Sequence, residues 1–320
     1  MKEIREFLEE DLVRFEQTFN GAVSSNVSLL DKIMKYIVKT KGKQLRPMFV
    51  ILSAKLFGET NEATFRAASL IELLHTATLV HDDVVDDSNQ RRGFFSINAL
   101  WKNKIAVLVG DYLLSKGLLL SLSNGDFHIL EILATAVKEM SEGELLQIEK
   151  ARKLDISEAV YFEIIRCKTA SLISSACCAG SFSTTQDQLT TDLMKKFGEK
   201  VGIAFQIKDD LFDYGKADVG KPTGNDIKEK KMTLPLIYTL NNCDAATKAK
   251  IIHIFKNATK KKSEVNYIID VVTKNGGISY AELQMKNYIE EAFLILDSLG
   301  PSNAKKHLKE LVNYTIERNY

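Results

Sequence analysis

The sequence predicts an all-α protein in which one domain, residues 1–320, folds as a single large helical bundle. Prolines are scarce: the four of the chain stand at positions 47, 222, 235 and 301, and three of them lie at plausible boundaries between helices. In the long proline-free stretches, apolar residues recur at the i, i+3, i+4 spacing of a buried helical stripe. No stretch alternates apolar and polar residues for long enough to predict a sheet. We therefore expect roughly ten or more helices, separated by glycines, around one core.

Two apolar stretches show the helical period most clearly. The first covers residues 62–80. Its predicted buried stripe consists of Ala67, Leu70, Ile71, Leu74 and Thr78. The second covers residues 157–180 and continues the same period through Val160, Ile164, Lys168 and Leu172. A third stretch, residues 105–120, is interrupted by Asp111 and Lys116 and is too short to span a bilayer comfortably.

Composition disfavours several classes of protein. The formal net charge is +1, whereas a protein that binds nucleic acid usually has a strong basic excess. The N-terminal sequence MKEIREFLEEDLVRFEQ mixes acids into its first turns and lacks the apolar core of a signal peptide. The four cysteines form neither a disulfide scaffold nor a zinc-type spacing. We expect a cytoplasmic protein that has no stable membrane anchor and no nucleic-acid partner.

An acidic cluster, HDDVVDD at residues 81–87, ends the helix predicted for the apolar stretch 62–80. Asp82 and Asp86 stand at i and i+4, so their carboxylates share one face of the helix, about 6 Å apart. Asp83 lies beside that face. These charges repel one another, and the helix dipole disfavours negative charge in a last turn, so the cluster loses stability unless a cation neutralises it. Arg91 and Arg92 follow in SNQRRG.

A second cluster, DDLFD, repeats this design after another apolar run. Asp209 and Asp213 again stand at i and i+4, Asp210 is adjacent, and Lys216 and Lys221 follow. Carboxylates on rigid helices suit a hard divalent ion, Mg²⁺ before a transition metal. Mg²⁺ usually binds through one or two carboxylates together with substrate phosphates. Acidic residues beside Arg and Lys therefore predict a site for Mg²⁺ and a diphosphate.

Each feature also has a simpler interpretation. One acidic cluster alone is explained equally well as a solvated face, but two clusters of the same form, each followed by basic residues, disfavour that explanation. A ferritin-like two-metal site needs paired Glu-x-x-His motifs, which the sequence does not supply. His75 lies two helical turns before Asp82, on the same face, and is otherwise explained as a core histidine. Lys168 and Thr169 are otherwise explained as residues of a helix surface.

Taken in order, the motifs resemble those of the trans-isoprenyl diphosphate synthases, most closely the long-chain members of octaprenyl and solanesyl type. DDVVD with RRG resembles the first aspartate-rich motif of that family, and DDLFD resembles the second. The other matching stretches are GKQLRP at 42–47, LLHTATLVHDD at 73–83, VLVGD at 107–111, EGELLQ at 142–147, KTA at 168–170 and GKPTGNDIKEKKMTLP at 220–235. The resemblance implies the helical bundle of the isoprenoid synthase type, with a central active-site cavity.

The resemblance also implies a role for each matching residue. Its Mg²⁺ ligands fall on Asp82, Asp86 and Asp209, supported by Asp83, Asp210 and Asp213. Its site for isopentenyl diphosphate falls on Lys43, Arg46, His75 and Arg92. The residues that hold the allylic diphosphate are matched by Arg91, Lys168, Lys221 and Lys231. The groups that lie against the developing allylic cation are matched by Thr169 and Gln206.

The implied activity is a Mg²⁺-dependent, sequential head-to-tail condensation of isopentenyl diphosphate onto an allylic diphosphate. The resemblance implies a homodimer with about three Mg²⁺ ions in each substrate-bound site. In this family, bulky aromatic residues four or five positions before the first aspartate stop elongation early. Those positions hold Thr78 and Ala77, which are both small. We therefore expect a long, octaprenyl-like product, suited to quinone side chains and released in transient contact with a membrane.

Several alternatives remain. A shorter geranylgeranyl or farnesyl product is possible, because Ala77 is also explained by close helix packing. A class I terpene cyclase usually has an Asn/Ser/Glu triad in place of the second aspartate motif, and DDLFD and GKQLRP argue against it. A non-catalytic partner subunit tends to lose its aspartates, whereas both sets are present here. A helical binding protein without chemistry is the remaining class.

Overall fold

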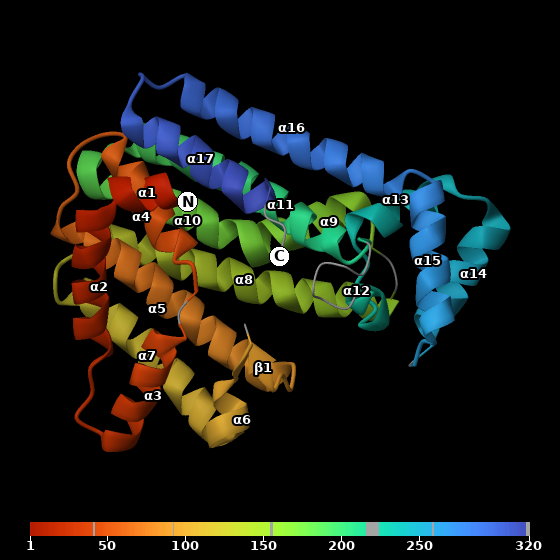
Figure 1. Cartoon of the computed structure of the whole chain (residues 1–320), viewed down its shortest axis with the longest axis horizontal. Helices are drawn as coiled ribbons and strands as arrows, with labels where there is room; N and C mark the ends of the chain where they lie inside the picture. Colours follow the sequence, from red (N-terminus) through yellow and green to blue (C-terminus); the bar gives the residue numbers. More distant parts are fainter. Residues whose placement is uncertain (41, 92, 154–155, 216–223, 258, 318–320) are drawn as a thin grey trace. The chain divides into compact units, whose positions relative to one another are not determined.

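The computed structural model describes the chain except for residues 41, 92, 154–155, 216–223, 258 and 318–320. Most of the described part is helical, which confirms the predicted all-α class (Figure 1). The strands in that part form one antiparallel hairpin, in which β1 (Gln90–Arg91) pairs with β2 (Phe94–Phe95). Strands of two residues are too short to produce an alternating pattern in the sequence.

Packing divides the chain into two compact units. Unit 1 comprises Met1–Val137, Ser175–Lys195 and Pro301–Leu311. Unit 2 comprises Lys138–Ser174, Lys196–Gly300 and Val312–Tyr320. The first acidic motif belongs to unit 1 and the second to unit 2. The single domain expected from the sequence stays a prediction.

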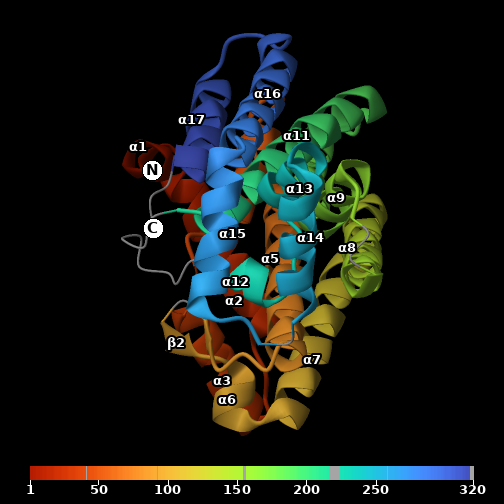
Figure 2. The ribbon, with the colours of Figure 1, turned by 90° about the vertical axis from the view of Figure 1, so that its right-hand side faces the viewer.

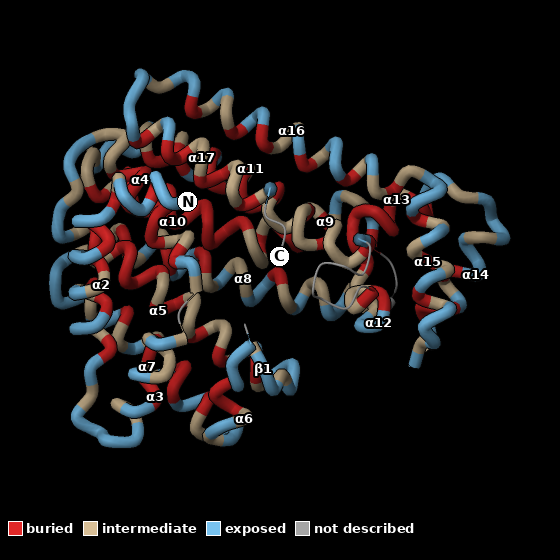
Figure 3. The backbone as a smooth tube through the Cα atoms, viewed as in Figure 1, coloured by how far each residue is buried: buried red, intermediate tan, exposed pale blue. Residues whose placement is uncertain are grey.

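Unit 1 is organised around α5 (Glu62–Val85), the long helix that ends in the first acidic motif. The other helices that lie wholly or largely in this unit are α1 (Lys2–Phe7), α2 (Glu9–Val23), α3 (Ser28–Lys39), α4 (Leu45–Lys55), α6 (Ile97–Trp101), α7 (Asn103–Leu122) and α10 (Ser171–Thr185). Helices α2, α4 and α7 pack directly on α5, and Figure 3 shows buried residues along α4 and α5. A capping box between Asn61 and Thr64 fixes the start of α5.

Two glycines allow α7 to approach α5 closely. A Cβ atom on Gly110 would lie 2.1 Å from His81 Nε2, and one on Gly117 would lie 2.8 Å from Leu70 Cδ1. Among the described helices, α7 alone has the length, 20 residues, and the mean hydropathy, 1.7, of a membrane-spanning helix. It is thus longer than the stretch 105–120 that the sequence indicated. Core helices of soluble proteins also meet these criteria, and α7 packs on α5.

The remaining helices follow in chain order. They are α8 (Phe127–Lys153), α9 (Glu158–Ile165), α11 (Gln188–Phe212), α12 (Asn225–Lys228), α13 (Leu234–Asn242), α14 (Ala245–Lys256), α15 (Lys262–Lys274), α16 (Gly277–Asp297) and α17 (Asn303–Glu317). Within unit 2, α13, α15 and α16 pack on one another (Figure 2). Gly277 permits the contact between α16 and α13, because a Cβ there would lie 2.3 Å from the Pro235 carbonyl oxygen.

A single π turn, η1 (Arg166–Ala170), joins α9 to α10, and the Ser171 N–H donates to the Arg166 carbonyl oxygen across it. The sequence indicated one continuous stripe over residues 157–180. The extra residue in the π turn shifts the phase of that stripe by about 100°. Ile164 and Leu172 are accordingly buried, whereas Lys168 between them is only half-buried.

Glycines on two neighbouring helices accommodate the π turn. A Cβ on Gly143 of α8 would lie 2.7 Å from Cys167 Cβ, and one on Gly202 of α11 would lie 2.4 Å from Ala170 Cα. A larger residue at either position would force the backbones apart, because a packed interior has no spare volume. These glycines therefore hold α8 and α11 close to the turn that contains Lys168 and Thr169.

Candidate active site

The first acidic motif occupies the last turn of α5. Asp82 and Asp86 are exposed, and the Asp86 N–H donates to the Asp82 carbonyl oxygen at 2.8 Å. Helical geometry therefore continues to the end of the motif and places the two carboxylates on one side of the helix. Two like charges at the negative end of a helix dipole leave this surface suited to a cation.

Asp83, by contrast, points into the protein. Its side chain is 5% exposed, and its Oδ1 accepts a hydrogen bond from Arg91 Nε at 2.8 Å and lies 2.7 Å from Arg91 Nη2 in the same ion pair. The Asp83 carbonyl oxygen accepts from Asn98 Nδ2 at 3.1 Å and from the Ser88 N–H at 2.9 Å. Asp83 thus ties the β1–β2 hairpin to α5 and sets the direction of the Arg91 guanidinium.

A pocket of about 780 Å³, counted with the open solvent at its mouth, lies beside this motif within unit 1. The residues that line it include His75, Asp83, Arg91, Phe15, Phe19 and Phe95. The structure therefore brings His75 and Arg91, both predicted from the sequence to hold diphosphates, to one concave surface. The pocket combines cationic or titratable groups with an aromatic wall, which suits an anionic ligand with an apolar part.

Lys43 and Arg46 lie at the N-terminus of α4, on either side of Gln44, which also lines the pocket. Gln44 is buried and has a left-handed backbone, with φ of 59°, at the residue before the helix. Lys43 is exposed and Arg46 is half-buried. The positive end of the α4 dipole adds to their charge, so this corner favours an anion.

The two residues predicted to set product length lie one turn before the motif on α5. Ala77 is fully buried, with 0% exposure. Thr78 is half-buried, and its hydroxyl donates to the His75 carbonyl oxygen at 2.8 Å. Leu74 and Ile71, which continue toward the start of the helix, are buried aliphatic residues.

The second acidic motif ends α11, and its three aspartates differ in environment. Asp209 is half-buried, and Asp210 is buried. Burial, followed by the nearby carboxylate of Asp226, raises the pKa of Asp210 to about 8. Asp213 accepts from the backbone N–H groups of Asn225 and Asp226 at 2.7 and 3.1 Å. Asp213 therefore fixes the start of α12, and Asp209 is the carboxylate of this motif best placed for an external cation.

Thr169 and Gln206, both predicted to lie against the allylic cation, are hydrogen-bonded to each other within unit 2. Thr169 Oγ1 donates to Gln206 Oε1 at 2.7 Å, across the contact between η1 and α11. Gln206 Nε2 donates to Asp210 Oδ1 at 2.8 Å, one turn further along α11. Tyr161 donates to Asp210 Oδ2 at 2.7 Å. The role of Tyr161 was not predicted from the sequence, where it reads as one more apolar residue of a helix.

Lys168, the first residue of the KTA motif, is held by α8. Its Nζ forms an ion pair with Glu144 and lies 3.4 Å from Gln147 Oε1. Glu144 and Gln147 belong to the stretch EGELLQ, and Gly143 of the same stretch contacts η1. That motif thus both orients the lysine and makes room for the turn that presents it.

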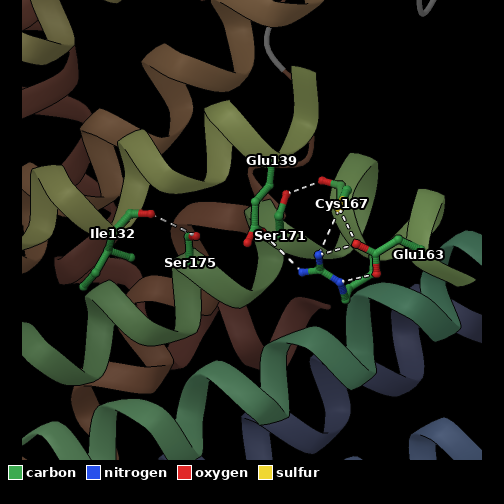
Figure 4. Close-up of polar contacts among 7 residues, drawn as sticks. Ile132, Glu139, Glu163, Cys167, Ser171 and Ser175 are labelled. Carbon is green, nitrogen blue, oxygen red and sulfur yellow. Dashed lines mark hydrogen bonds and ion pairs between the residues drawn. The ribbon is translucent and has the colours of Figure 1, made fainter. Parts of the chain in front are cut away.

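Polar contacts around Arg166 hold the π turn in place (Figure 4). Arg166 Nε and Nη2 donate to the two carboxylate oxygens of Glu163 at 2.9 and 2.8 Å. Its Nη1 lies 3.5 Å from Glu139 Oε2, and Ser171 Oγ donates to the Cys167 carbonyl oxygen at 2.6 Å. Sequence reasoning missed these residues. The available signal was an arginine in an apolar run, two positions before KTA.

Of the remaining basic residues predicted from the sequence, Lys231 lies in the described part of the chain. Lys231 is half-buried, and its Nζ lies 2.6 Å from Glu229 Oε2. Its backbone N–H donates to the Asp226 carbonyl oxygen at 2.8 Å, which holds it near the second motif. Arg92 and Lys221 lie outside the described residues.

The donor set fits Mg²⁺. Asp82 and Asp86 in unit 1, and Asp209 in unit 2, each offer only carboxylate oxygens, and these are the ligands that hard divalent ions prefer. Within the described part of the chain, no three His, Cys, Asp or Glu side chains are grouped closely enough to hold a metal by themselves. Such incomplete ligation is usual for Mg²⁺, which keeps waters and takes up substrate phosphate oxygens.

The chain is similar to known proteins over most of its length. A family model described as Polyprenyl synthetase matches residues 27–272. The chain is 35% identical over 312 residues to an all-trans-nonaprenyl-diphosphate synthase (geranyl-diphosphate specific) of Rhodobacter capsulatus, which covers 97% of this chain and 95% of the relative.

Solved structures are similar over the whole chain. A decaprenyl diphosphate synthase from Rhodobacter capsulatus is 34% identical, with a TM-score of 0.94 over 100% of this chain and 99% of its own. A polyprenyl synthase from Caulobacter crescentus, complexed with calcium and isoprenyl diphosphate, is 30% identical with a TM-score of 0.91, covering 99% and 97%. A geranylgeranyl pyrophosphate synthase from Bacteroides thetaiotaomicron is 36% identical with a TM-score of 0.84, covering 98% of each chain.

Proposed function

The chain belongs to the polyprenyl synthetase family, and from this premise we propose its reaction and the residues that perform it. It is a prenyltransferase of the long-chain polyprenyl diphosphate synthase type. It condenses isopentenyl diphosphate, head to tail, onto an allylic diphosphate. The observation that supports this most directly is the pair of acidic motifs. Each ends a helix with an accessible aspartate, Asp82 or Asp209, and each has a cationic side chain held nearby.

Ionisation of the allylic diphosphate is the first step. Asp82 and Asp86 of the first motif and Asp209 of the second would hold Mg²⁺, which when bound would neutralise the charge that develops on the leaving diphosphate. Arg91, aimed by Asp83, donates charge-assisted hydrogen bonds to the same diphosphate. Lys168, held by Glu144, adds a point charge beside it.

Attack by the isopentenyl double bond is the second step. Lys43, Arg46 and His75 hold the diphosphate of this substrate near the N-terminus of α4. Thr169 and Gln206 lie against the allylic cation. The departing diphosphate accepts the proton that is finally lost, because the described residues around Thr169 offer no evident side-chain base. Water must be excluded until then, since it would quench the cation.

The product is a long-chain, octaprenyl-like polyprenyl diphosphate suited to quinone side chains. Ala77 and Thr78 are small, and Leu74 and Ile71 behind them are aliphatic, so no aromatic ring on this face of α5 stops the chain early. The alternative is a geranylgeranyl product, and the observation in support of that alternative is the similarity to a geranylgeranyl pyrophosphate synthase.

A homodimer is supported by an exposed apolar face on α7. Five residues along this helix are between 42% and 58% exposed: Val107, Leu108, Leu118, Leu119 and Leu122. An apolar surface of this kind is typical of a protein interface. We place the enzyme in the cytoplasm, in transient contact with a membrane when it releases its apolar product.

One assay tests the proposed function. The purified chain is incubated alone with labelled isopentenyl diphosphate, an allylic primer and Mg²⁺, and the products are sized by chromatography. Labelled chains longer than geranylgeranyl support a long-chain synthase. A cyclic hydrocarbon would indicate a terpene cyclase. No product without an added partner subunit would indicate a non-catalytic component.

A further inference from the structure

One uninterrupted series of hydrogen bonds leads from a deeply buried tyrosine to Thr169. Tyr161 Oη donates to Asp210 Oδ2 at 2.7 Å, and Gln206 Nε2 donates to Asp210 Oδ1 at 2.8 Å. Thr169 Oγ1 then donates to Gln206 Oε1 at 2.7 Å. Tyr161 and Asp210 are 3% and 6% exposed, so both carboxylate oxygens are engaged away from solvent. All four residues belong to unit 2.

The donors and acceptors in this series have only one consistent arrangement once Asp210 accepts from Gln206. The amide nitrogen of Gln206 then faces Asp210, so its oxygen must face Thr169. Gln206 Oε1 cannot donate, and the hydroxyl proton of Thr169 is therefore committed to it. A proton on Asp210 would not change this, because it can reside on Oδ2, facing the Tyr161 oxygen, while Oδ1 still accepts.

This arrangement decides which end of the Thr169 hydroxyl dipole remains available. With its only proton given to Gln206, Thr169 presents oxygen lone pairs to any group opposite. Lone pairs stabilise a positive centre, whereas a hydroxyl proton would repel it. A dipole that is already oriented also needs no reorganisation as charge develops, and such groups contribute most to transition-state stabilisation.

We propose that Tyr161 is a positioning residue that acts through Asp210 and Gln206 to hold the Thr169 oxygen toward the allylic cation, a role that rests on the proposed function. Tyr161 does not touch the substrate. It fixes one oxygen of Asp210, and this leaves the other oxygen as an acceptor at the position that Gln206 requires. Asp210 accordingly serves as an internal anchor, although it stands in the acidic motif beside Asp209.

A double-mutant cycle tests the proposal. The variants are Tyr161→Phe, Thr169→Val and the double variant, compared by single-turnover rate and by KM for both substrates. We expect Tyr161→Phe to lower the single-turnover rate about tenfold, because one buried hydrogen bond is lost, with both KM values unchanged. Thr169→Val should lower it further, and Thr169→Ser should restore most of it. The double variant should be no slower than Thr169→Val, because Tyr161 acts through Thr169.

A matched control separates positioning from general loosening. Tyr214 is also buried in unit 2, 4% exposed, and its hydroxyl pairs with Thr233 Oγ1 at 2.8 Å, outside the series. Tyr214→Phe should lower the midpoint of thermal unfolding about as much as Tyr161→Phe and leave the single-turnover rate unchanged. An equal loss of rate in both Phe variants would overturn the proposal. Losses that multiply in the double variant would overturn it as well.

A second substitution keeps the test decisive if Tyr161→Phe does not fold. In Asp210→Asn, the carboxamide oxygen can still accept from Gln206 while its nitrogen donates to the Tyr161 oxygen. We expect a rate within about threefold of wild type and an unchanged melting midpoint. A loss of 100-fold or more in the folded variant would contradict the anchor role. Failure of the proposed function itself is seen separately, as absent product from the wild-type chain.

Discussion

Replacing Asp83 by Asn separates metal ligation from the positioning of Arg91. The Asp83 side chain is 5% exposed, and its Oδ1 accepts a hydrogen bond from Arg91 Nε at 2.8 Å and is ion-paired with Arg91 Nη2 at 2.7 Å. Asn keeps an oxygen in that place but loses the charge. Charge-assisted hydrogen bonds are roughly twice as strong as neutral ones, so the loss is about 1–2 kcal/mol after allowance for the exposed part of Arg91.

This loss should appear as substrate affinity. We expect KM for the allylic diphosphate to rise about 5- to 30-fold in Asp83→Asn, with the half-saturating Mg²⁺ concentration near that of wild type. Asp87→Asn is the matched control: Asp87 is an exposed aspartate of the same cluster with φ of 50°, a conformation that Asn also tolerates. Its KM should not change. If Asp83→Asn instead raises the Mg²⁺ requirement as strongly as Asp82→Asn, at unchanged KM, then Asp83 is a metal ligand and the reasoning is refuted.

Three further predictions concern the metal ligands, the length of the product and the packing of the π turn. Asp82→Ala and Asp209→Ala should each lower kcat by about 100-fold or more while the circular dichroism spectrum stays unchanged. Near-normal turnover of either variant at saturating Mg²⁺ would contradict the assignment of these residues as metal ligands. Ala77→Phe should shorten the main product, because a ring replaces a methyl group at a fully buried position, and identical chromatograms for variant and wild type would contradict this. Gly143→Ala should destabilise the fold by about 1–3 kcal/mol, since its Cβ would meet Cys167, whereas Gly21→Ala, with nothing within 4 Å, should not lower the melting midpoint.

Helices and motif positions were predictable from the sequence because both depend on local spacing. Of the predicted stripe in α5, Ala67, Leu70, Ile71 and Leu74 are buried, whereas Thr78 is half-buried. Asp82 lies in the last turn of this helix, and Asp86 caps it. The π turn was not predictable, because one extra residue changes the phase without changing the composition. The sequence therefore predicted Lys168 as part of the buried stripe, but in the structure Lys168 is half-buried and residues next to it are buried instead.

Partners distant in sequence were also beyond prediction. Tyr161 and Asp210 are separated by 49 residues, and nothing in either local sequence marks the hydrogen bond between them. The same holds for Lys168 and Glu144, which meet because Gly143 lets α8 approach the π turn. Local patterns specify which side chains are present, and the close packing of helices decides which of them meet.

In both acidic motifs the first and second aspartates point in different directions, and helical geometry explains why. Successive residues of a helix are rotated by about 100°, so the second aspartate of each motif must point away from the face that the first occupies. Asp83 and Asp210 both turn inward and are 3% and 6% exposed, whereas Asp82 is exposed and Asp209 half-buried.

The inward aspartates can persist because each has specific partners. Asp83 accepts a hydrogen bond from Arg91 and is ion-paired with it, and Asp210 accepts one hydrogen bond from Tyr161 and one from Gln206. A buried carboxylate without such donors would be strongly destabilising. We therefore expect Asp83 and Asp210 to act as anchors for neighbouring side chains rather than as ligands of the metal. Substitution by Asn, which keeps the shape and an acceptor, should be tolerated far better there than at the first position.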